Sequence, residues 1–195
     1  MPKISVRIPT LNNYPGLLKA LTSILKQDFP KEFADIIGVL ARFKLQRSWI
    51  SVGGGGKSKV SGWIDGELTK LGWVAKGFDT KITVGADTYV SPTHEVDCFK
   101  NRVALEIEWN NKDPFFDRDL NNFRLLFDLR VISVGVIITR CDELQEIFDS
   151  LGRGDSYGAS TTHMSKLLPR IQGGGGAGCP ILAVGIRKSL YAESL

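Results

Sequence analysis

The stretch that decides the fold is EVDCFKNRVALEIEWNN, residues 95–111. Its second half alternates as a strand does, with Val103, Leu105, Ile107 and Trp109 on one face and Ala104, Glu106 and Glu108 on the other. Two carboxylates on one face are typical of an exposed edge strand. The apolar runs on either side of this stretch instead favour a strand inside the sheet, where unpaired carboxylates are costly. A bound cation removes that cost. With Asp97 on the preceding strand as a third oxygen ligand, the pattern predicts a Mg²⁺ site.

The rest of the chain predicts an α/β domain around this strand. Apolar periodicity indicates helices near residues 17–25, 33–43, 61–71, 116–127, 144–151 and 167–171. Short apolar runs indicate further strands at 82–84, 96–99, 131–139 and 180–186. The run VISVGVIIT, residues 131–139, is typical of a strand buried on both faces. We therefore expect three layers, with a central mixed sheet flanked by helices.

Composition fits one soluble globular domain and excludes several classes of protein. The chain has 195 residues, of which 43% are hydrophobic and 24% charged. It has no apolar run of about 18 residues and no apolar stretch at the N-terminus, so we expect neither a membrane span nor a secretory signal. Cys98, Cys141 and Cys179 lie far apart in sequence, which favours reduced cytosolic thiols over disulfides or a zinc site.

Charge is unevenly distributed along the chain, although its net value is only +4. Residues 1–60 contain ten Lys or Arg and three acids, whereas residues 61–195 contain fifteen Lys or Arg and eighteen acids. This division is typical of a surface that binds a polyanion next to an acidic, cation-binding site. The alternative is charge scattered over a solvated surface.

Two familiar catalytic patterns are disfavoured. The segment SVGGGGKS, residues 51–58, resembles a P-loop, but that pattern requires glycine where Ser51 stands. We expect a mobile loop before a helix, with Lys57 and Lys59 free to meet phosphates. The chain has two histidines, His94 and His163, and no G-x-S-x-G sequence, so a Ser-His-Asp hydrolase is disfavoured. Neither histidine has metal-ligand spacing to another His or Cys, and we expect both on the surface or locally hydrogen-bonded.

Residues 96–111 resemble the type II restriction endonucleases of the BglII and BstYI group, within the PD-(D/E)xK nuclease superfamily. BamHI is a structural relative that also has Glu where most members have Lys. The resemblance extends to GGGGKS at 53–58, DRDLNNF at 117–123, YGASTTHMSKLLPRI at 157–171 and GCPILAVGI at 178–186, and covers about residues 50–188. The chain departs from the superfamily pattern at two positions. Val96 replaces the proline before the first acid, and Glu108 replaces the lysine, a change found within this group.

The resemblance implies a restriction-endonuclease-like fold and a set of site residues. Asp97 and Glu106 would bind the metal, and Glu108 would position the attacking water or bind the metal through water. Glu67 would be an additional catalytic acid, with an exposed helix glutamate as the alternative. The residues expected to contact bases are Asn110, Asn111, Ser160, Thr161, Thr162 and His163. For those at 160–162, capping of the following helix is the alternative.

As a whole, the resemblance implies a Mg²⁺-dependent, homodimeric endonuclease that cuts double-stranded DNA at a short palindrome. Such an enzyme is part of a restriction-modification system in the prokaryotic cytoplasm, without a membrane partner. We expect a single domain over residues 1–195, with a helical part at 1–50 and the nuclease core at 51–188. The alternatives are a repair or recombination nuclease of low sequence specificity and a catalytically inactive DNA-binding module. The intact acids at 97, 106 and 108 disfavour the inactive module.

Overall fold

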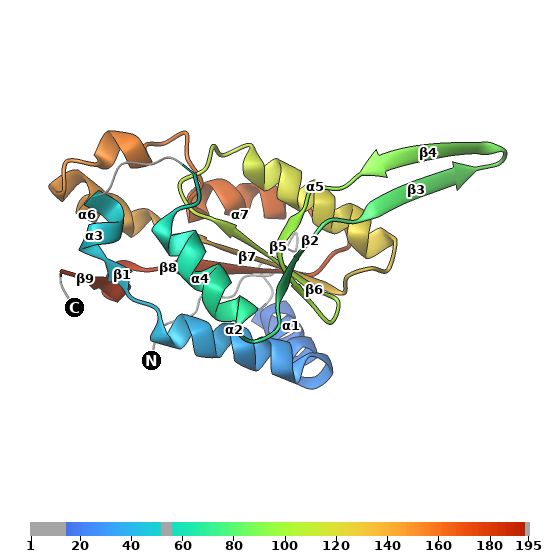
Figure 1. Ribbon diagram of the computed structural model, residues 1–195, viewed down its shortest axis with the longest axis horizontal. Helices are drawn as coiled ribbons and strands as arrows, with labels where there is room; N and C mark the ends of the chain where they lie inside the picture. The colour runs from blue at the N-terminus through green and yellow to red at the C-terminus, as the bar shows by residue number, and fades with distance from the viewer. Residues whose placement is uncertain (1–14, 52–55, 194–195) are drawn as a thin grey trace.

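A computed structural model of the protein describes residues 15–51 and 56–193. Its central sheet has five strands in the order β2-β5-β6-β7-β8 (Figure 1). Their bounds are β2 Val74–Lys76, β5 Val96–Lys100, β6 Val103–Glu108, β7 Val134–Arg140 and β8 Ile181–Ile186. The pairs β2–β5 and β5–β6 are antiparallel, whereas β6–β7 and β7–β8 are parallel. The expected mixed sheet is therefore confirmed.

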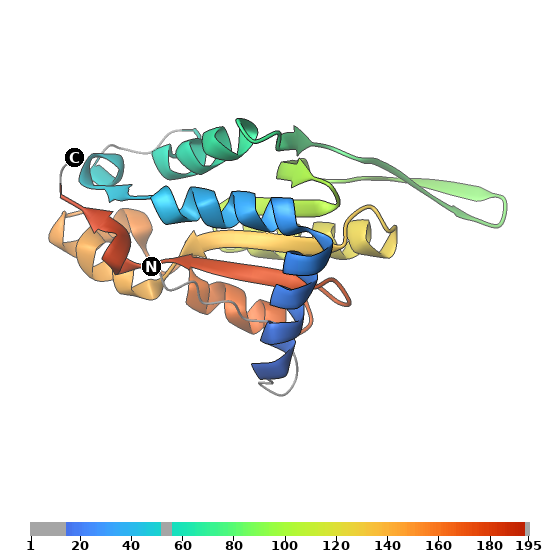
Figure 2. The same ribbon diagram turned by 90° about the horizontal axis from the view of Figure 1, so that it is seen from below.

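Helices cover both faces of this sheet, as Figure 2 shows. The seven described α-helices are α1 Pro15–Asp28, α2 Pro30–Arg42, α3 Arg47–Ser51, α4 Lys59–Thr69, α5 Phe115–Asp128, α6 Gln145–Ser150 and α7 Met164–Gln172. One core cluster joins α1, α2, α3, α4 and α6 to one face, and a second joins α5 and α7 to the other. The three-layer α/β architecture is confirmed. Among residues 15–51 and 56–193, no helix has the length and apolarity needed to cross a membrane.

The strand β6 lies at the centre of the sheet and is buried along its whole length. Its residues Val103, Leu105 and Ile107 pack into the cluster with α2 and α4, whereas Ala104 packs into the cluster with α5 and α7. The predicted alternation is confirmed. It follows that Glu106 and Glu108, on the same face as Ala104, point toward α5 from the interior of the sheet.

The segment before β5 forms a projecting hairpin that the sequence analysis did not predict as such. The strands β3 (Asp79–Val84) and β4 (Asp87–Pro92) pair with each other around a two-residue loop and extend away from the domain (Figures 1 and 2). The predicted strand at 82–84 is thus present, but outside the central sheet. Apolar side chains on both strands of this hairpin remain exposed: Val84 in β3 is 63% accessible and Val90 in β4 is 69% accessible. An apolar run alone does not distinguish a strand of the core from one in an exposed arm.

The remaining described elements are short. They are β1 Leu45–Gln46, η1 Asp142–Leu144, η2 Gly154–Tyr157, η3 Lys188–Leu190 and β9 Tyr191–Ala192. The strands β1 and β9 pair in parallel, so the C-terminal segment lies beside the chain that links α2 to α3. Residues 1–14 of the predicted basic region and Gly53–Gly55 of the glycine run lie outside the described residues.

Close packing of α5 on the sheet depends on a glycine in β7. A Cβ atom at Gly135 would lie 2.4 Å from Cδ2 of Phe123. Gly135→Ala should therefore destabilise the fold by about 1–3 kcal/mol through overpacking, measured by urea unfolding. As a control, Gly66→Ala in α4 meets no atom within 4 Å and should be neutral or stabilising by up to about 1 kcal/mol. Equal losses from both substitutions would contradict this explanation.

Candidate active site

The β5–β6 hairpin places Asp97 beside Glu106. Cys98 pairs with Leu105 across the two antiparallel strands. Asp97, just before Cys98, therefore lies opposite Glu106, just after Leu105. The backbone N–H of Asp97 donates to Oε2 of Glu106 at 3.2 Å, and the N–H of Ile107 donates to Oδ2 of Asp97 at 2.9 Å. Asp97 is half-buried, whereas Glu106 is fully buried. Local strand pairing therefore brings together two of the acids that the sequence analysis selected.

Glu108 lies at the end of β6 on the same face and is held on both carboxylate oxygens. The side-chain amide of Asn111 donates to its Oε2 at 2.8 Å, and Nη2 of Arg118 lies 3.4 Å from its Oε1. The residue is 2% exposed. Asn111 and Arg118 thus fix the orientation of a carboxylate that the protein otherwise buries.

Helix α5 adds a carboxylate that the sequence analysis did not select. Asp119 is fully buried, and its Oδ1 accepts hydrogen bonds from Nε and Nη2 of Arg118 at 3.0 and 2.9 Å. Asp119 lies three residues after Phe116 and four before Phe123, both of which are buried. Helical periodicity therefore places it on the face that packs against the sheet. That spacing was the available signal in the sequence.

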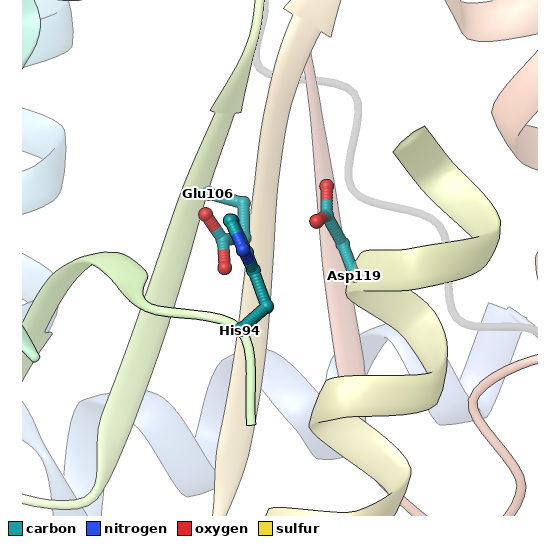
Figure 3. Close-up of side chains that lie close together, drawn as sticks. All are labelled: His94, Glu106 and Asp119. Atoms are coloured by element: carbon teal, nitrogen blue, oxygen red, sulfur yellow. The ribbon is translucent and has the colours of Figure 1, made fainter. Parts of the chain in front are cut away.

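His94 approaches the same point from the segment that leads into β5 (Figure 3). Its backbone carbonyl accepts a hydrogen bond at 3.0 Å from the side-chain amide of Asn122 on α5. One potential ligand atom from each of His94, Glu106 and Asp119 lies within 4.8 Å of the other two. The expectation of a surface or locally hydrogen-bonded histidine missed this neighbourhood of His94, because only the tertiary fold brings α5 to the hairpin.

Burial, together with repulsion from neighbouring carboxylates, raises the pKa of three of the acids, Glu106, Glu108 and Asp119. Burial, with the carboxylates of Asp119 and Asp97, raises the pKa of Glu106 well above its usual range. Burial and the neighbouring Glu108 carboxylate raise the pKa of Asp119 to about 8. Burial likewise raises the pKa of Glu108, whereas burial and Arg118 lower the pKa of His94. A bound dication would reverse these trends for the acids, since it favours their charged form.

Two oxygen atoms of this group have no hydrogen-bond partner within the part of the chain that is described. They are Oε1 of Glu106 and Oδ2 of Asp119, and both are buried. Buried acceptors are normally satisfied, and a bound ion is one of the standard reasons for an exception. Clustered carboxylates are also the ligands that hard dications prefer. The residues present therefore fit a divalent metal ion.

An open cleft of about 690 Å³ runs past the acids, with Asp97 and Glu108 on its wall. The residues that line it come from five parts of the chain: Trp49; Gly56, Lys57, Ser58, Lys59 and Ser61; His94 and Asp97; Ile107, Glu108, Trp109, Asn110, Asn111, Phe115 and Arg118; and Arg153 and Tyr157. The cleft thus brings the start of α4 and the residues after β6 to the acids. Lys57, Lys59, Asn110 and Asn111, all selected from the sequence, share its wall.

The lysines at the start of α4 differ in their surroundings. The ammonium group of Lys57 forms an ion pair with Asp65, so the expectation that it is free is wrong. Lys59 is exposed and has no ion-pair partner within the described ranges. The helix itself begins at Ser58, whose hydroxyl accepts a hydrogen bond from the N–H of Ser61 at 2.9 Å.

Residues 160–163 do not line the cleft, but residues 160–162 hydrogen-bond to other parts of the chain, two of these three to the segment that follows β6. Thr162 exchanges hydrogen bonds with the backbone of Asn111: its N–H donates at 2.8 Å and its Oγ1 accepts at 3.2 Å. The hydroxyl of Thr161 accepts from the buried Arg140 at 2.9 Å, and the carbonyl of Ser160 accepts from the N–H of Asp113. These contacts hold the segment that follows β6. None of the three side chains caps α7.

The N-terminus of α7 is satisfied by an acid from another element. Asp142 accepts a hydrogen bond from the N–H of Ser165 at 3.2 Å. Its other oxygen lies 2.6 Å from Nδ1 of His163. The capping alternative for residues 160–162 is therefore wrong, and His163 is locally hydrogen-bonded, as expected.

Glu67 lies on α4 away from the lining of the cleft. It forms ion pairs with Arg42 at 3.1 Å and with Lys70. Two residues earlier, Asp65 faces the hairpin, where its Oδ1 accepts a hydrogen bond from the thiol of Cys98 at 3.4 Å. Of the two acids on this helix, Asp65 is therefore the one that contacts β5.

The comparison with protein families decides the relationship. The family model of restriction endonuclease BglII/BglIII matches residues 20–186. The chain belongs to this family. The match spans all five strands of the central sheet and the whole acid cluster, and it identifies the α/β fold as restriction-endonuclease-like. The family consists of restriction endonucleases, which are nucleases that act on DNA. The search of curated proteins found no match.

Proposed function

We propose that this protein is a type II restriction endonuclease. It hydrolyses phosphodiester bonds of double-stranded DNA at a short palindromic site, depends on Mg²⁺ and serves a restriction-modification system. The observation that carries the proposal is the contact of Asp97 with Glu106 on the β5–β6 hairpin, with Asp97 and Glu108 on the wall of an open cleft. Asp97, Glu106 and Glu108 would hold the metal, the last directly or through water. Bound there, Mg²⁺ supplies Lewis acidity for the scissile phosphate and the attacking water.

Glu108 is the residue best placed to orient the attacking water. Asn111 and Arg118 hold its two oxygens, so the carboxylate is fixed before DNA arrives. Such prior orientation reduces the entropic part of the barrier. Arg118 also lines the cleft and retains further N–H donors that can meet a phosphate oxygen. The protein thus supplies orientation and charge, without a nucleophilic side chain.

Recognition of sequence falls to the residues that follow β6. Asn110 and Asn111 line the cleft one and two residues beyond the last acid of the strand. An asparagine can bond bidentately with the N6 and N7 atoms of adenine in the major groove. We assign base contacts to these two residues and, by the family resemblance, to residues 160–163. Because Thr162 bonds to the backbone of Asn111, the two segments would meet DNA together.

A palindromic site is matched by a two-fold symmetric protein, so the proposal includes a homodimer in which each subunit cuts one strand. The test of the whole proposal is digestion of a sequenced phage DNA with Mg²⁺, followed by mapping of the ends, with chelator as control. Discrete fragments with symmetric ends support it. A smear of fragments would identify a nuclease of low specificity. DNA binding without any cleavage would identify an inactive binding module.

The lysines of the cleft give a prediction about binding. Lys59→Ala should weaken binding to all DNA sequences alike and reduce the slope of log K against log salt concentration by about one. Lys57→Ala should have a similar or larger effect, because it also leaves the Asp65 carboxylate without its partner. Fluorescence anisotropy at several salt concentrations measures both. An effect restricted to the cognate site would contradict a phosphate contact.

A further inference from the structure

The interior of the acid cluster contains polar atoms that the fold leaves without hydrogen-bond partners among the described residues. Oε1 of Glu106 and Oδ2 of Asp119 are buried and unpartnered within the described residues, and both side chains are fully buried. The imidazole of His94 forms no hydrogen bond within the same ranges, although its backbone is anchored by Asn122. Three potential ligand atoms therefore lie close together, and no hydrogen-bond donor among the described residues reaches them.

Their spacing suits a single metal ion. One ligand atom from each of His94, Glu106 and Asp119 lies within 4.8 Å of the other two. Ligands bonded at about 2.0–2.2 Å to a common ion are at most about 4.4 Å apart. Small side-chain adjustments would therefore close the group around an ion. Figure 3 shows the three side chains close together, one from the segment that leads into β5, one from β6 and one from α5.

The support behind these ligands is also in place. Arg118 holds Oδ1 of Asp119 through two hydrogen bonds, which leaves Oδ2 as the free oxygen. The other oxygen of Glu106 accepts from the backbone of Asp97, which leaves Oε1 toward α5. Ligands oriented by such outer partners are typical of metal sites.

We propose that His94, Glu106 and Asp119 form an inner metal site that takes a transition-metal dication such as Zn²⁺ or Mn²⁺. The donor set carries the choice of metal. One imidazole nitrogen with two carboxylates suits zinc, iron or manganese, whereas Mg²⁺ prefers oxygen ligands and retained waters. The inner site is distinct from the catalytic set at Asp97, Glu106 and Glu108, because two of its three ligands, His94 and Asp119, belong to it alone.

The two sites share one residue through different atoms. Oε2 of Glu106 faces Asp97, and Oε1 is the free atom of the inner group. A carboxylate used in this way can bridge two cations. Binding at the inner site is therefore coupled to binding at the outer one, and the coupling is reciprocal. Metal binding at the inner site can be measured without DNA, so it is tested separately from the proposed cleavage.

The test uses the full chain, free of DNA and Mg²⁺, and exploits its two histidines. Zn²⁺ is titrated into ¹⁵N-labelled protein, and the imidazole resonances are followed by NMR. One equivalent should shift the ring nitrogens of His94 and leave those of His163 in place. Shifts of neither histidine, or equal shifts of both, would overturn the inner site. This measurement needs no variant and so does not depend on the folding of one.

Calorimetry with variants provides a second measurement. His94→Gln and Asp119→Asn should each weaken the first Zn²⁺ affinity by about 10-fold or more. The matched control His163→Gln should leave that affinity within about 3-fold, since His163 is bonded to Asp142 elsewhere. Asp97→Asn should also retain Zn²⁺ while losing cleavage, which separates the two sites. Equal weakening by His94→Gln and His163→Gln would contradict the assignment.

Discussion

Asp97→Asn should lower Mg²⁺-dependent cleavage of DNA by at least about 10³-fold, and Glu106→Gln should do the same. Both substitutions preserve side-chain volume while they remove a negative charge that the proposed metal requires. DNA binding should be unchanged or tighter, because the acids beside the cleft repel phosphates until a cation is bound. Single-turnover cleavage of the cognate site, with anisotropy measurements of binding, separates the two effects.

The matched control is Glu67→Gln, the same change on a glutamate that is paired with Arg42 and Lys70. Because Glu67 does not line the cleft, Glu67→Gln should lower the cleavage rate far less than Glu106→Gln does. Retention of a tenth or more of the wild-type rate in Asp97→Asn or Glu106→Gln would remove that residue from the metal site. Comparable losses at residues 67 and 106 would instead make Glu67 a catalytic acid.

The central strands could be predicted because their signals are local. The alternation along residues 103–109 already contains both faces of β6, and strand pairing then sets Asp97 opposite Glu106 without any information from distant segments. The run at 131–139 similarly identified β7, although the strand itself begins at Val134. Patterns of period two or 3.6 within one element therefore predicted most of the sheet and its helices.

The inner part of the acid cluster could not be predicted in the same way, since it depends on how α5 docks. The sequence shows that Asp119 shares a helix face with Phe116 and Phe123, but not which strand that face covers. Glu67 and Asp65 illustrate the same limit. Two residues apart on α4, they point in different directions, and only the packed helix shows that Asp65 contacts Cys98. Tertiary contacts of this kind have no short sequence signature.

The contacts of Asn111 lead to the second large effect that we expect. Its side-chain amide donates to Glu108, and its backbone is held by Thr162 at 2.8 and 3.2 Å. Asn111→Ala should therefore slow cleavage of every site by about 10- to 100-fold, because Glu108 loses the partner that orients it. If Asn111 also contacts a base, the cognate site should lose a further 1–3 kcal/mol, roughly, of discrimination against single-base variants.

Cleavage of the cognate site and of its single-base variants distinguishes these two contributions. Asn121→Ala is the matched control, since Asn121 is exposed on α5 and bonds only to Arg124 among the described residues. Equal losses of rate at all sites would leave Asn111 as a positioning residue for Glu108 and refute the base contact. A loss confined to the cognate site would show the reverse, because the orientation of Glu108 would then not depend on the amide. Losses of both kinds are expected, since the residue joins the end of the catalytic strand to the wall of the cleft.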